Sequence, residues 1–351
     1  MRFRNKPCLL SILLILTTIC VVYVEIFSYY LNTYHWYQIE CLHPDKCTKI
    51  LLVADPQIIG NHDEILHFLT PFTIFDSDRF LRKTYLQAYN FVQPDIVIFL
   101  GDLMDEAHRA SNQEFHQYVR RLLNIFLDTS SSSTVRHIWL PGDNDIGGED
   151  SMITQEKIRR FERAFSQPNL ITFRNLNLFK INRLISDIPV YKSNRDFYNT
   201  SNIFIGLSHI PLMFKPSTFV EKVINKMKPQ ILFTAHEHKS IIINADAHLR
   251  QNIHLTPVTP DNNGIFEYTL GTEDMYEIIV PTASYRMGTS NVGYGYAVIE
   301  KNNLKYTLLW SPSRFNQLNL YCILIFLFVL YFLCRLVVKC FRVLCSFRRK
   351  L

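Results

Sequence analysis

Aspartate and histidine residues recur in this 351-residue chain where short apolar runs stop. Such runs in the middle of the chain end in acidic, amide or imidazole side chains, and these ends are Asp55-Pro56-Gln57, Gly101-Asp102-Leu103-Met104-Asp105, Gly142-Asp143-Asn144-Asp145, Ser208-His209 and His236-Glu237-His238. Carboxylates and imidazoles are ligands for divalent metal ions. A single histidine is more often a core or surface imidazole, but this ordered set favours a metal site.

Two divalent ions ~3.5–4 Å apart can clamp both the attacking and the leaving oxygen of a phosphate ester. One carboxylate must bridge the ions, and we assign this role to Asp102, which follows a glycine at the end of a run. Asp55 is expected to bind one ion, and His209 and His236 the other. His238 lies two residues beyond His236 and could reach back to the first ion. The pattern therefore predicts phosphoester hydrolysis.

The apolar runs have the length and composition of strands buried on both faces. They cover residues 49–54, 95–100, 135–140, 203–207 and 231–234, and helical patterns cover residues 78–92, 112–127 and 154–165. This alternation predicts an α/β domain with parallel strands, in which ligands bind beyond the carboxyl ends of the strands. We expect residues 60–77 to form a long connection near the site. Segments 278–288 and 296–305 are expected to be strands of a closing second sheet.

These motifs resemble those of the calcineurin-like metallophosphoesterases over about residues 49–300, and most of all those of the metallophosphoesterase 1 group. The shared stretches are ADPQIIG, GDLMDE, PGDNDIG, SHIPL, HEH and VPTASYR. The resemblance implies a layered α/β/β/α sandwich flanked by two transmembrane helices, with two divalent metal ions as cofactors. The metal ligands that it implies are Asp55, Asp102, Asp143, His209, His236 and His238.

The same resemblance implies a membrane-anchored phosphodiesterase of the early secretory pathway. Members of the group remove ethanolamine phosphate from a mannose of glycosylphosphatidylinositol (GPI) anchors and so support transport from the endoplasmic reticulum to the Golgi. The expected partners are the GPI glycolipid, membrane lipid and transport-vesicle machinery at the cytosolic tails. Two alternatives stay open: a catalytically weak relative that acts as a lumenal binding or trafficking factor, and a phosphomonoesterase.

Three residues depart from the pattern of the superfamily. Gln57 stands where a histidine ligand is common, and Asp143 stands where asparagine is usual. More oxygen ligands and fewer imidazoles shift the preference from Zn²⁺ toward Mn²⁺ or Mg²⁺, and we expect Mn²⁺. Asn144 occupies the catalytic position of a histidine that protonates the leaving group. Because a general acid contributes typically 10²–10⁴-fold, its replacement implies a slower enzyme, another proton donor or lost activity.

Other polar residues near these motifs have open or secondary roles. Arg286 is expected either to meet a substrate phosphate or to form a plain salt bridge. Asp105 and Asp145 are expected to orient metal ligands. We expect Glu106, His108 and the His62–Asp63 pair to lie in solvated loops.

Two apolar segments are long enough to cross a bilayer core of ~30 Å. Residues 9–27 are interrupted only by Glu25, and residues 318–338 only by Arg335. An uncleaved anchor is favoured over a signal peptide, because the first run exceeds roughly 7–15 residues and no small-residue cleavage site follows it. Basic residues on the terminal side of each run predict cytosolic termini. The expected order is a cytosolic tail (1–8), an anchor (9–31), a lumenal domain (32–317), a second helix (318–338) and a basic cytosolic tail (339–351).

The net charge of +6 belongs to the ends of the chain. Nine of the 37 basic residues flank or end the apolar segments, and without them and Glu25 the chain holds 28 basic against 30 acidic residues. This distribution argues against a nucleic-acid-binding face. Cys41 and Cys47 follow the first anchor and predict a small disulfide loop in an oxidising lumen. Asn199 begins an Asn-Thr-Ser sequon, and a glycan there would need the lumenal side.

Overall fold

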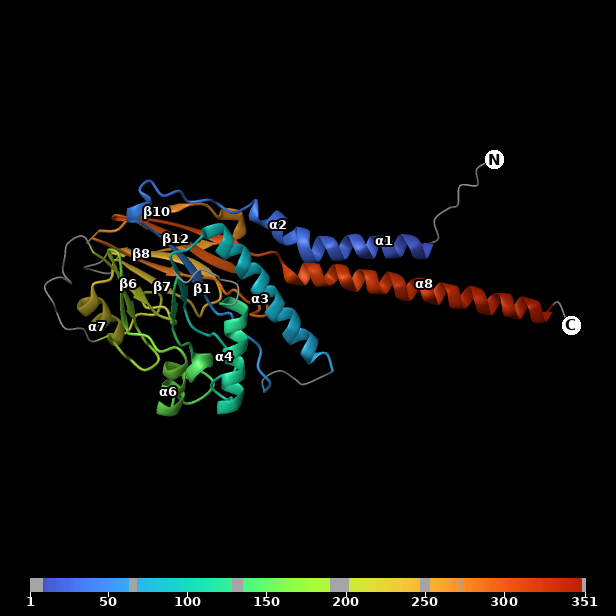
Figure 1. Cartoon of the computed structure of the whole chain (residues 1–351), viewed down its shortest axis with the longest axis horizontal. Coiled ribbons are helices and arrows are strands. Elements are labelled where there is room, and N and C mark those ends of the chain that lie inside the picture. The colour runs from blue at the N-terminus through green and yellow to red at the C-terminus, as the bar shows by residue number, and fades with distance from the viewer. Residues whose placement is uncertain are drawn as a thin grey trace. The chain divides into compact units, whose positions relative to one another are not determined.

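The computed structural model describes residues 9–62, 68–127, 135–189, 202–246, 253–271 and 273–348. The chain divides into two units, each described here by itself. One unit is His35–Ser311, and the other combines Met1–Tyr34 with Pro312–Leu351. Figure 1 shows both sheets and helices α3 to α7 in the first unit, and helices α1, α2 and α8 in the second. The sequon at Asn199 lies outside the described residues.

The first sheet has six strands in the order β10-β13-β12-β1-β2-β3. Its strands β1, β2 and β3 are parallel, and β12 runs antiparallel to β1. β13 is antiparallel to both β12 and β10. The bounds are β1 (Cys47–Val53), β2 (Ile96–Phe99), β3 (Arg136–Trp139), β10 (Phe266–Thr269), β12 (Gly293–Glu300) and β13 (Asn303–Trp310).

The second sheet has seven strands in the order β4-β5-β6-β7-β11-β8-β9. Strands β5, β6, β7 and β11 are parallel, and the outer strands are antiparallel to their neighbours. The bounds are β4 (Leu170–Phe173), β5 (Leu176–Lys180), β6 (Ile203–Leu207), β7 (Ile231–Thr234), β8 (Ser240–Asp246), β9 (His254–Val258) and β11 (Asp274–Ile279).

Helices begin where side chains can accept hydrogen bonds from the backbone N–H groups of the first turn. Ser111 and Glu114 form a reciprocal capping box at the start of α4, and the Thr154 and Ser217 hydroxyls cap α6 and α7. The bounds are α3 (Thr70–Val92), α4 (Asn112–Phe126), α5 (Asp143–Ile146), α6 (Gln155–Ala164) and α7 (Thr218–Met227), with short 3₁₀ turns at Pro44–Lys46 and Pro260–Asn262.

Successive side chains of β1 point alternately into two hydrophobic cores, one on each face of the first sheet. Leu51 and Val53 pack in the core that holds Tyr85 of α3 and Phe126 of α4, whereas Ile50 and Leu52 belong to the core shared with the second sheet. A third core joins the second sheet to α7 through Val220, Val223 and Ile224. The layers are therefore helices, sheet, sheet and helix, as the resemblance implies (Figure 1).

Three expectations about elements were wrong. Segment 278–288 is not a strand over its length, since β11 ends at Ile279. Residues 70–77 belong to α3 rather than to a connection, and Pro71 is tolerated because the first-turn N–H groups have no partner in a helix. The segment 296–305 is a hairpin, since β12 ends at Glu300, Lys301 takes φ 54°, and β13 begins at Asn303. Both hairpin strands belong to the first sheet, not to the second. Cys41 and Cys47 are disulfide-bonded, which confirms that prediction.

The other unit consists of apolar helices. The bounds are α1 (Leu9–Val22), a π-helical turn (Tyr23–Phe27), α2 (Ser28–Thr33) and α8 (Arg314–Arg348). Leu9–Thr33 and Arg314–Arg342 reach mean hydropathies of 2.5 and 2.6, so both are long and apolar enough to cross a membrane. Within this unit, the Tyr321 hydroxyl donates to Glu25 at 2.8 Å, and Arg314 lies 3.4 Å from the same carboxylate.

Candidate metal site

Five of the six predicted ligands meet at the carboxyl ends of strands. The structure forms two overlapping groups whose ligand atoms lie within 4.8 Å of one another: Asp55, Asp102 and His209, and Asp143, His209 and His236. Each of these residues follows a different strand, namely β1, β2, β3, β6 or β7. Because the strands are parallel within each sheet, their ends share one edge. The fold thus unites residues up to 181 positions apart.

His209 and Asp143 are at the centre of the cluster. His209 Nδ1 lies 2.9 Å from the Leu100 carbonyl oxygen, to which it donates, so Nε2 is left to accept from or bind another group. His209 Nε2 lies 3.0 Å from Asp143 Oδ1 and 3.5 Å from Asp102 Oδ1. His236 Nδ1 approaches the same Asp143 oxygen at 3.2 Å. Fixing the imidazole through its second nitrogen is a common feature of metal-binding histidines.

His238 is outside both groups, and Gln57 connects it to them. The Gln57 side-chain nitrogen donates to Asp102 Oδ2 at 2.9 Å and lies 3.3 Å from His238 Nε2. The residue that replaces a common histidine ligand therefore donates to the proposed bridging carboxylate. The metal-binding role of His238 stays a prediction.

Asn144 holds the Asp102 carboxylate from the opposite loop. Its backbone N–H donates to Asp102 Oδ1 and its side-chain amide donates to Asp102 Oδ2, both at 3.0 Å. Asp102 thus accepts hydrogen bonds from both of the residues that depart from the usual histidines, Gln57 and Asn144. In this arrangement Asn144 orients a ligand, and a part in leaving-group departure stays a prediction.

The backbone is strained at the same strand ends. Positive φ angles occur at Asp55 (46°), Gln57 (40°), Asp102 (49°), His236 (69°) and His238 (57°). Non-glycine residues avoid this region, and such strain gathers at functional sites. Gly101 has φ 100°, and a Cβ atom there would lie 2.7 Å from the His209 ring. This position therefore requires glycine so that β2 can end close to the imidazole.

Burial and neighbouring charges shift the pKa values of the side chains in the cluster. Burial raises the pKa of Asp55 to about 7, with a further rise from the Asp102 charge. Burial also raises the pKa of Asp102, and the Asp143 charge adds to the rise. Burial alone would lower the pKa of His209, but the three neighbouring carboxylates raise it to about 10. Burial and the charges of His236 and His209 lower the pKa of His238 to about 4.

The donor set fits two divalent cations. A bound cation neutralises the negative charge of buried carboxylates that would otherwise repel one another. Neutral imidazoles can serve as the remaining metal ligands. The residues that would hold the ions are Asp55, Asp102, Asp143, His209, His236 and His238. Among the described residues, the two groups share His209, and the predicted division of ligands between the ions stays a prediction.

Asp145 joins two ligand-bearing loops. Its carboxylate is fully buried and accepts from the backbone N–H groups of Leu103, Met104 and Gly142 at 3.1, 3.1 and 2.9 Å. The β2 and β3 loops are therefore held in register by one side chain. Arg286 lies 3.4 Å from Asp105, so it forms the salt bridge that the sequence left as one alternative.

The assignment of Glu106 and His108 to solvated loops was wrong. Their exposed fractions are 1% and 4%. Glu106 accepts from the His62 N–H and the Tyr118 hydroxyl, and His108 Nδ1 lies 3.0 Å from the Asn144 carbonyl oxygen. His62 is exposed beside Glu114, and Asp63 is outside the described residues. Burial followed from the packing of α4 over this loop, which the local sequence does not encode.

Glu277 is a site-supporting residue that sequence reasoning missed. It lies in β11, fully buried, and accepts from the N–H groups of Leu212, Met213 and Phe214 just after His209. Its only signal was one acidic residue in an apolar strand. This carboxylate fixes the loop that carries an imidazole ligand.

Replacing Glu277 with glutamine is expected to lower stability by about 2 kcal/mol, because one amide oxygen cannot serve three N–H groups. Burial raises the pKa of Glu277, so the folded state binds the proton more tightly than the unfolded state does. Its contribution to stability should fall as the pH rises above the ordinary carboxyl range, and the glutamine variant should lack this slope. Thermal unfolding between pH 5 and 8 measures both effects, with exposed Glu273→Gln as the control. Equal melting temperatures for the two variants would contradict the assigned role.

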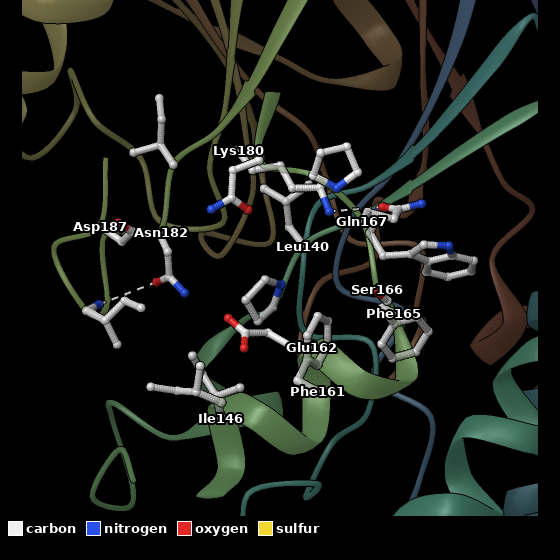
Figure 2. A pocket seen from close by; sticks show the side chains of 17 residues that line it. Leu140, Ile146, Phe161, Glu162, Phe165, Ser166, Gln167, Lys180, Asn182 and Asp187 are labelled. Atoms are coloured by element: carbon white, nitrogen blue, oxygen red, sulfur yellow. Dashed lines mark hydrogen bonds between the residues drawn. The ribbon is translucent and has the colours of Figure 1, made fainter. Parts of the chain in front are cut away.

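A separate cavity of about 390 Å³ lies beside the loop that follows β3 (Figure 2). Leu140 lines it from that loop, Ile146 from α5, Phe161 and Glu162 from α6, and Lys180 from β5. The Lys180 ammonium donates to the Gln167 amide oxygen at 2.9 Å, and burial lowers its pKa to about 8. None of the six predicted ligands lines this cavity, so it is not the metal site.

Residues 48–240, more than half of the chain, match the family model of the calcineurin-like phosphoesterases. The chain belongs to this family. Family members are metal-dependent phosphoester hydrolases with a dinuclear metal site. The resemblance found in the sequence is thereby confirmed.

Several known proteins are similar to part of this chain. Metallophosphoesterase 1 of Ailuropoda melanoleuca is 27% identical over 187 residues, which cover 51% of this chain and 45% of that protein. An uncharacterised protein of Schizosaccharomyces pombe is 28% identical over 237 residues, covering 60% and 54%. The chain thus spans about half the length of the curated relatives that it matches. Purple acid phosphatase PPD1 of yellow lupin aligns over 74% of this chain and 51% of that chain, with 14% identity and a TM-score of 0.46.

Proposed function

We propose that this chain is a membrane-anchored phosphodiesterase whose active site is the Asp/His cluster. The observation that carries the proposal is the convergence of buried carboxylates and imidazoles from five strand ends, in a chain of this family. Two divalent ions bound there would supply Lewis acidity and neutralise the charge of a phosphodiester. Aryl phosphodiester hydrolysis by the purified protein with and without Mn²⁺ tests the activity. No metal-dependent turnover would refute it.

The residues of the chain have separate tasks in this proposal. His209 presents Nε2 because Leu100 accepts from its other nitrogen, and Asp102 is oriented by donors on both of its oxygens. Asn144 is a neutral donor beside the carboxylates, so it can hold a phosphate oxygen or a departing oxygen but cannot release a proton at neutral pH. The rigid strand ends hold these groups before the substrate arrives.

The proposed substrate is the ethanolamine phosphate on a mannose of GPI anchors. This step rests on the similarity to proteins named Metallophosphoesterase 1 and on the motifs shared with that group. The chain would then act during transport from the endoplasmic reticulum to the Golgi. Mass spectrometry of GPI glycans from cells with and without the protein provides the test. We expect glycans in its absence to retain one more ethanolamine phosphate, and unchanged glycans would refute the substrate.

Membrane anchoring by both apolar helices is part of the same proposal. Polar contacts within the helical unit support a retained first helix, since Tyr321 and Arg314 of α8 contact Glu25, and Gln317 donates to Ser28 at 2.8 Å. Buried polar pairs of this kind hold helices together in lipid. The proposed orientation places both ends of the chain in the cytosol and the catalytic unit in the lumen.

Protease treatment of sealed microsomes tests this orientation. We expect the tails to be trimmed and residues 48–310 to survive until detergent is added. Digestion of that stretch in sealed vesicles would refute the lumenal orientation.

A second candidate function is a catalytically weak relative that binds a lumenal ligand or supports trafficking. Gln57 and Asn144 favour it, because both stand where histidines would otherwise serve catalysis. The aryl phosphodiester assay separates the two candidates. A phosphomonoesterase differs only in substrate, and comparing mono- with diester rates distinguishes it.

Replacing Asn144 with histidine is expected to accelerate alkyl phosphodiesters selectively. Without a proton donor, rates should depend steeply on the pKa of the leaving group, with nitrophenyl esters cleaved far faster than alkyl esters. A histidine that titrates near neutral pH would supply the proton, for which the expected gain is up to roughly 10²-fold. The loss of the Asn144 amide bond to Asp102 opposes this gain, and Asn144→Ala controls for it. A wild-type rate that is insensitive to the leaving group would contradict the prediction.

A further inference from the structure

The beginning of α3 carries an uncharged aromatic surface. Phe68, just before the helix, is 90% exposed, and Phe72 and Phe75 are each 62% exposed. Within α3, the spacing of three residues places Phe72 and Phe75 on one side of the helix. No charged residue occurs from position 68 to 75. We call these three residues the aromatic face. Exposed apolar groups gathered in this way mark contacts with a protein or a membrane.

The aromatic face extends beyond the edge of the first sheet. The Thr84 hydroxyl of α3 lies 2.8 Å from that of Tyr294, the second residue of β12. Thr84 is therefore about level with the sheet edge where β12 begins. At 1.5 Å per residue, Phe72 lies roughly 18 Å further along the helix axis. Figure 1 shows this end of α3 projecting away from the strands.

The same edge holds the metal site. Leu52 of β1 pairs with Gly295, and Gly293 at the start of β12 pairs with Trp310 at the end of β13. Asp55, which follows β1, is therefore at the edge where β13 ends. The aromatic face and the Asp/His cluster thus lie on one side of the unit.

Both ends of the unit are at this edge as well. Trp36 donates its indole N–H to the Trp310 carbonyl oxygen at 2.9 Å, so the first and last residues of the unit lie close together. Only residues 311–313 separate β13 from α8, and they can span at most ~10 Å. If α8 crosses a bilayer, as proposed above, this edge cannot move far from the lipid.

We propose that the aromatic face docks into the surface of the bilayer that holds the apolar helices and keeps the metal site at a fixed height above the lipid. The occupant is lipid rather than a protein because aromatic side chains without charges suit the membrane interface. The proposal rests on the membrane anchoring proposed above, and it assigns the site a substrate presented at the lipid surface.

Tryptophan quenching in lipid nanodiscs tests the docking in the full-length protein. Phe72→Trp is the reporter, and Phe75→Trp is an independent second one should the first fail to fold. Leu255→Trp is the matched control, because Leu255 is 52% exposed in β9, the outermost strand of the second sheet, and pairs with Ile243 in the middle of β8. The fluorescence of the introduced tryptophan is the emission of the variant minus that of the wild type. In nanodiscs with dibrominated acyl chains, compared with unbrominated ones, we expect this fluorescence to fall about twofold or more for Phe72→Trp and to stay unchanged for Leu255→Trp.

The possible results separate docking from anchoring. Quenching of the α3 reporters alone supports the proposal. A protein that stays in the nanodiscs with unquenched α3 reporters overturns the docking and leaves the anchoring intact, and a protein partner would then be the occupant. A protein that leaves the nanodiscs after alkaline carbonate treatment overturns both the anchoring and the docking. Equal quenching at Leu255 also overturns the docking, because it would show that contact with lipid is not confined to α3.

Discussion

Replacing Asp102 with asparagine is expected to remove nearly all phosphodiester hydrolysis. Loss of a group that merely orients a metal ligand typically lowers activity or metal affinity 10–100-fold, so loss of a bridging carboxylate should exceed about 100-fold. The variant keeps the shape of the side chain, but the amide can no longer accept hydrogen bonds on both sides from Gln57 and Asn144. Initial rates with an aryl phosphodiester and metal content by elemental analysis measure the effect.

Asp261→Asn is the matched control, because Asp261 is exposed in a 3₁₀ turn and outside the cluster. It should keep wild-type turnover and two bound metal ions. A folded Asp102→Asn protein with full turnover and two ions would overturn the assignment of Asp102 and, with it, the proposed active site.

Replacing Asp145 with alanine is expected to destabilise the protein by about 3–5 kcal/mol. Each buried N–H group left without a partner costs about 1–3 kcal/mol, and three such groups depend on this carboxylate. Losses of this size are exceptional and require a named mechanism, which here is the loss of the connection between the β2 and β3 loops. At ~2–4 °C for each kcal/mol, the melting temperature should fall by roughly 10 °C.

Differential scanning fluorimetry of the purified variant measures this change. Asp150→Ala is the control, since Asp150 is exposed five residues further along the same loop region. Its melting temperature should match that of the wild type. An Asp145→Ala protein that melts with the control would show that the two loops are held by other contacts.

The ends of the strands, and the fact that they meet, could be predicted from the sequence alone. Apolar runs that stop at Asp55, Asp102, Asp143, His209 and His236 predict both the strands and their meeting point, because the ends of parallel strands share one edge. Cysteine spacing predicted the Cys41–Cys47 disulfide, which is a local feature. These predictions succeeded because each depends on short segments and on a general rule of sheet geometry.

Which groups support the site depends on tertiary packing. Glu106 and His108 looked solvated but are buried, because α4 packs over their loop. Glu277 supports the loop after His209 from a strand 68 positions away, and its sequence neighbourhood gives no sign of this partner. Such contacts join residues that are distant in sequence, and burial depends on what packs above them. For the same reason, the position of α3 beyond the sheet edge, where its aromatic face meets solvent, follows from the packing of Thr84 on Tyr294 and not from the local pattern.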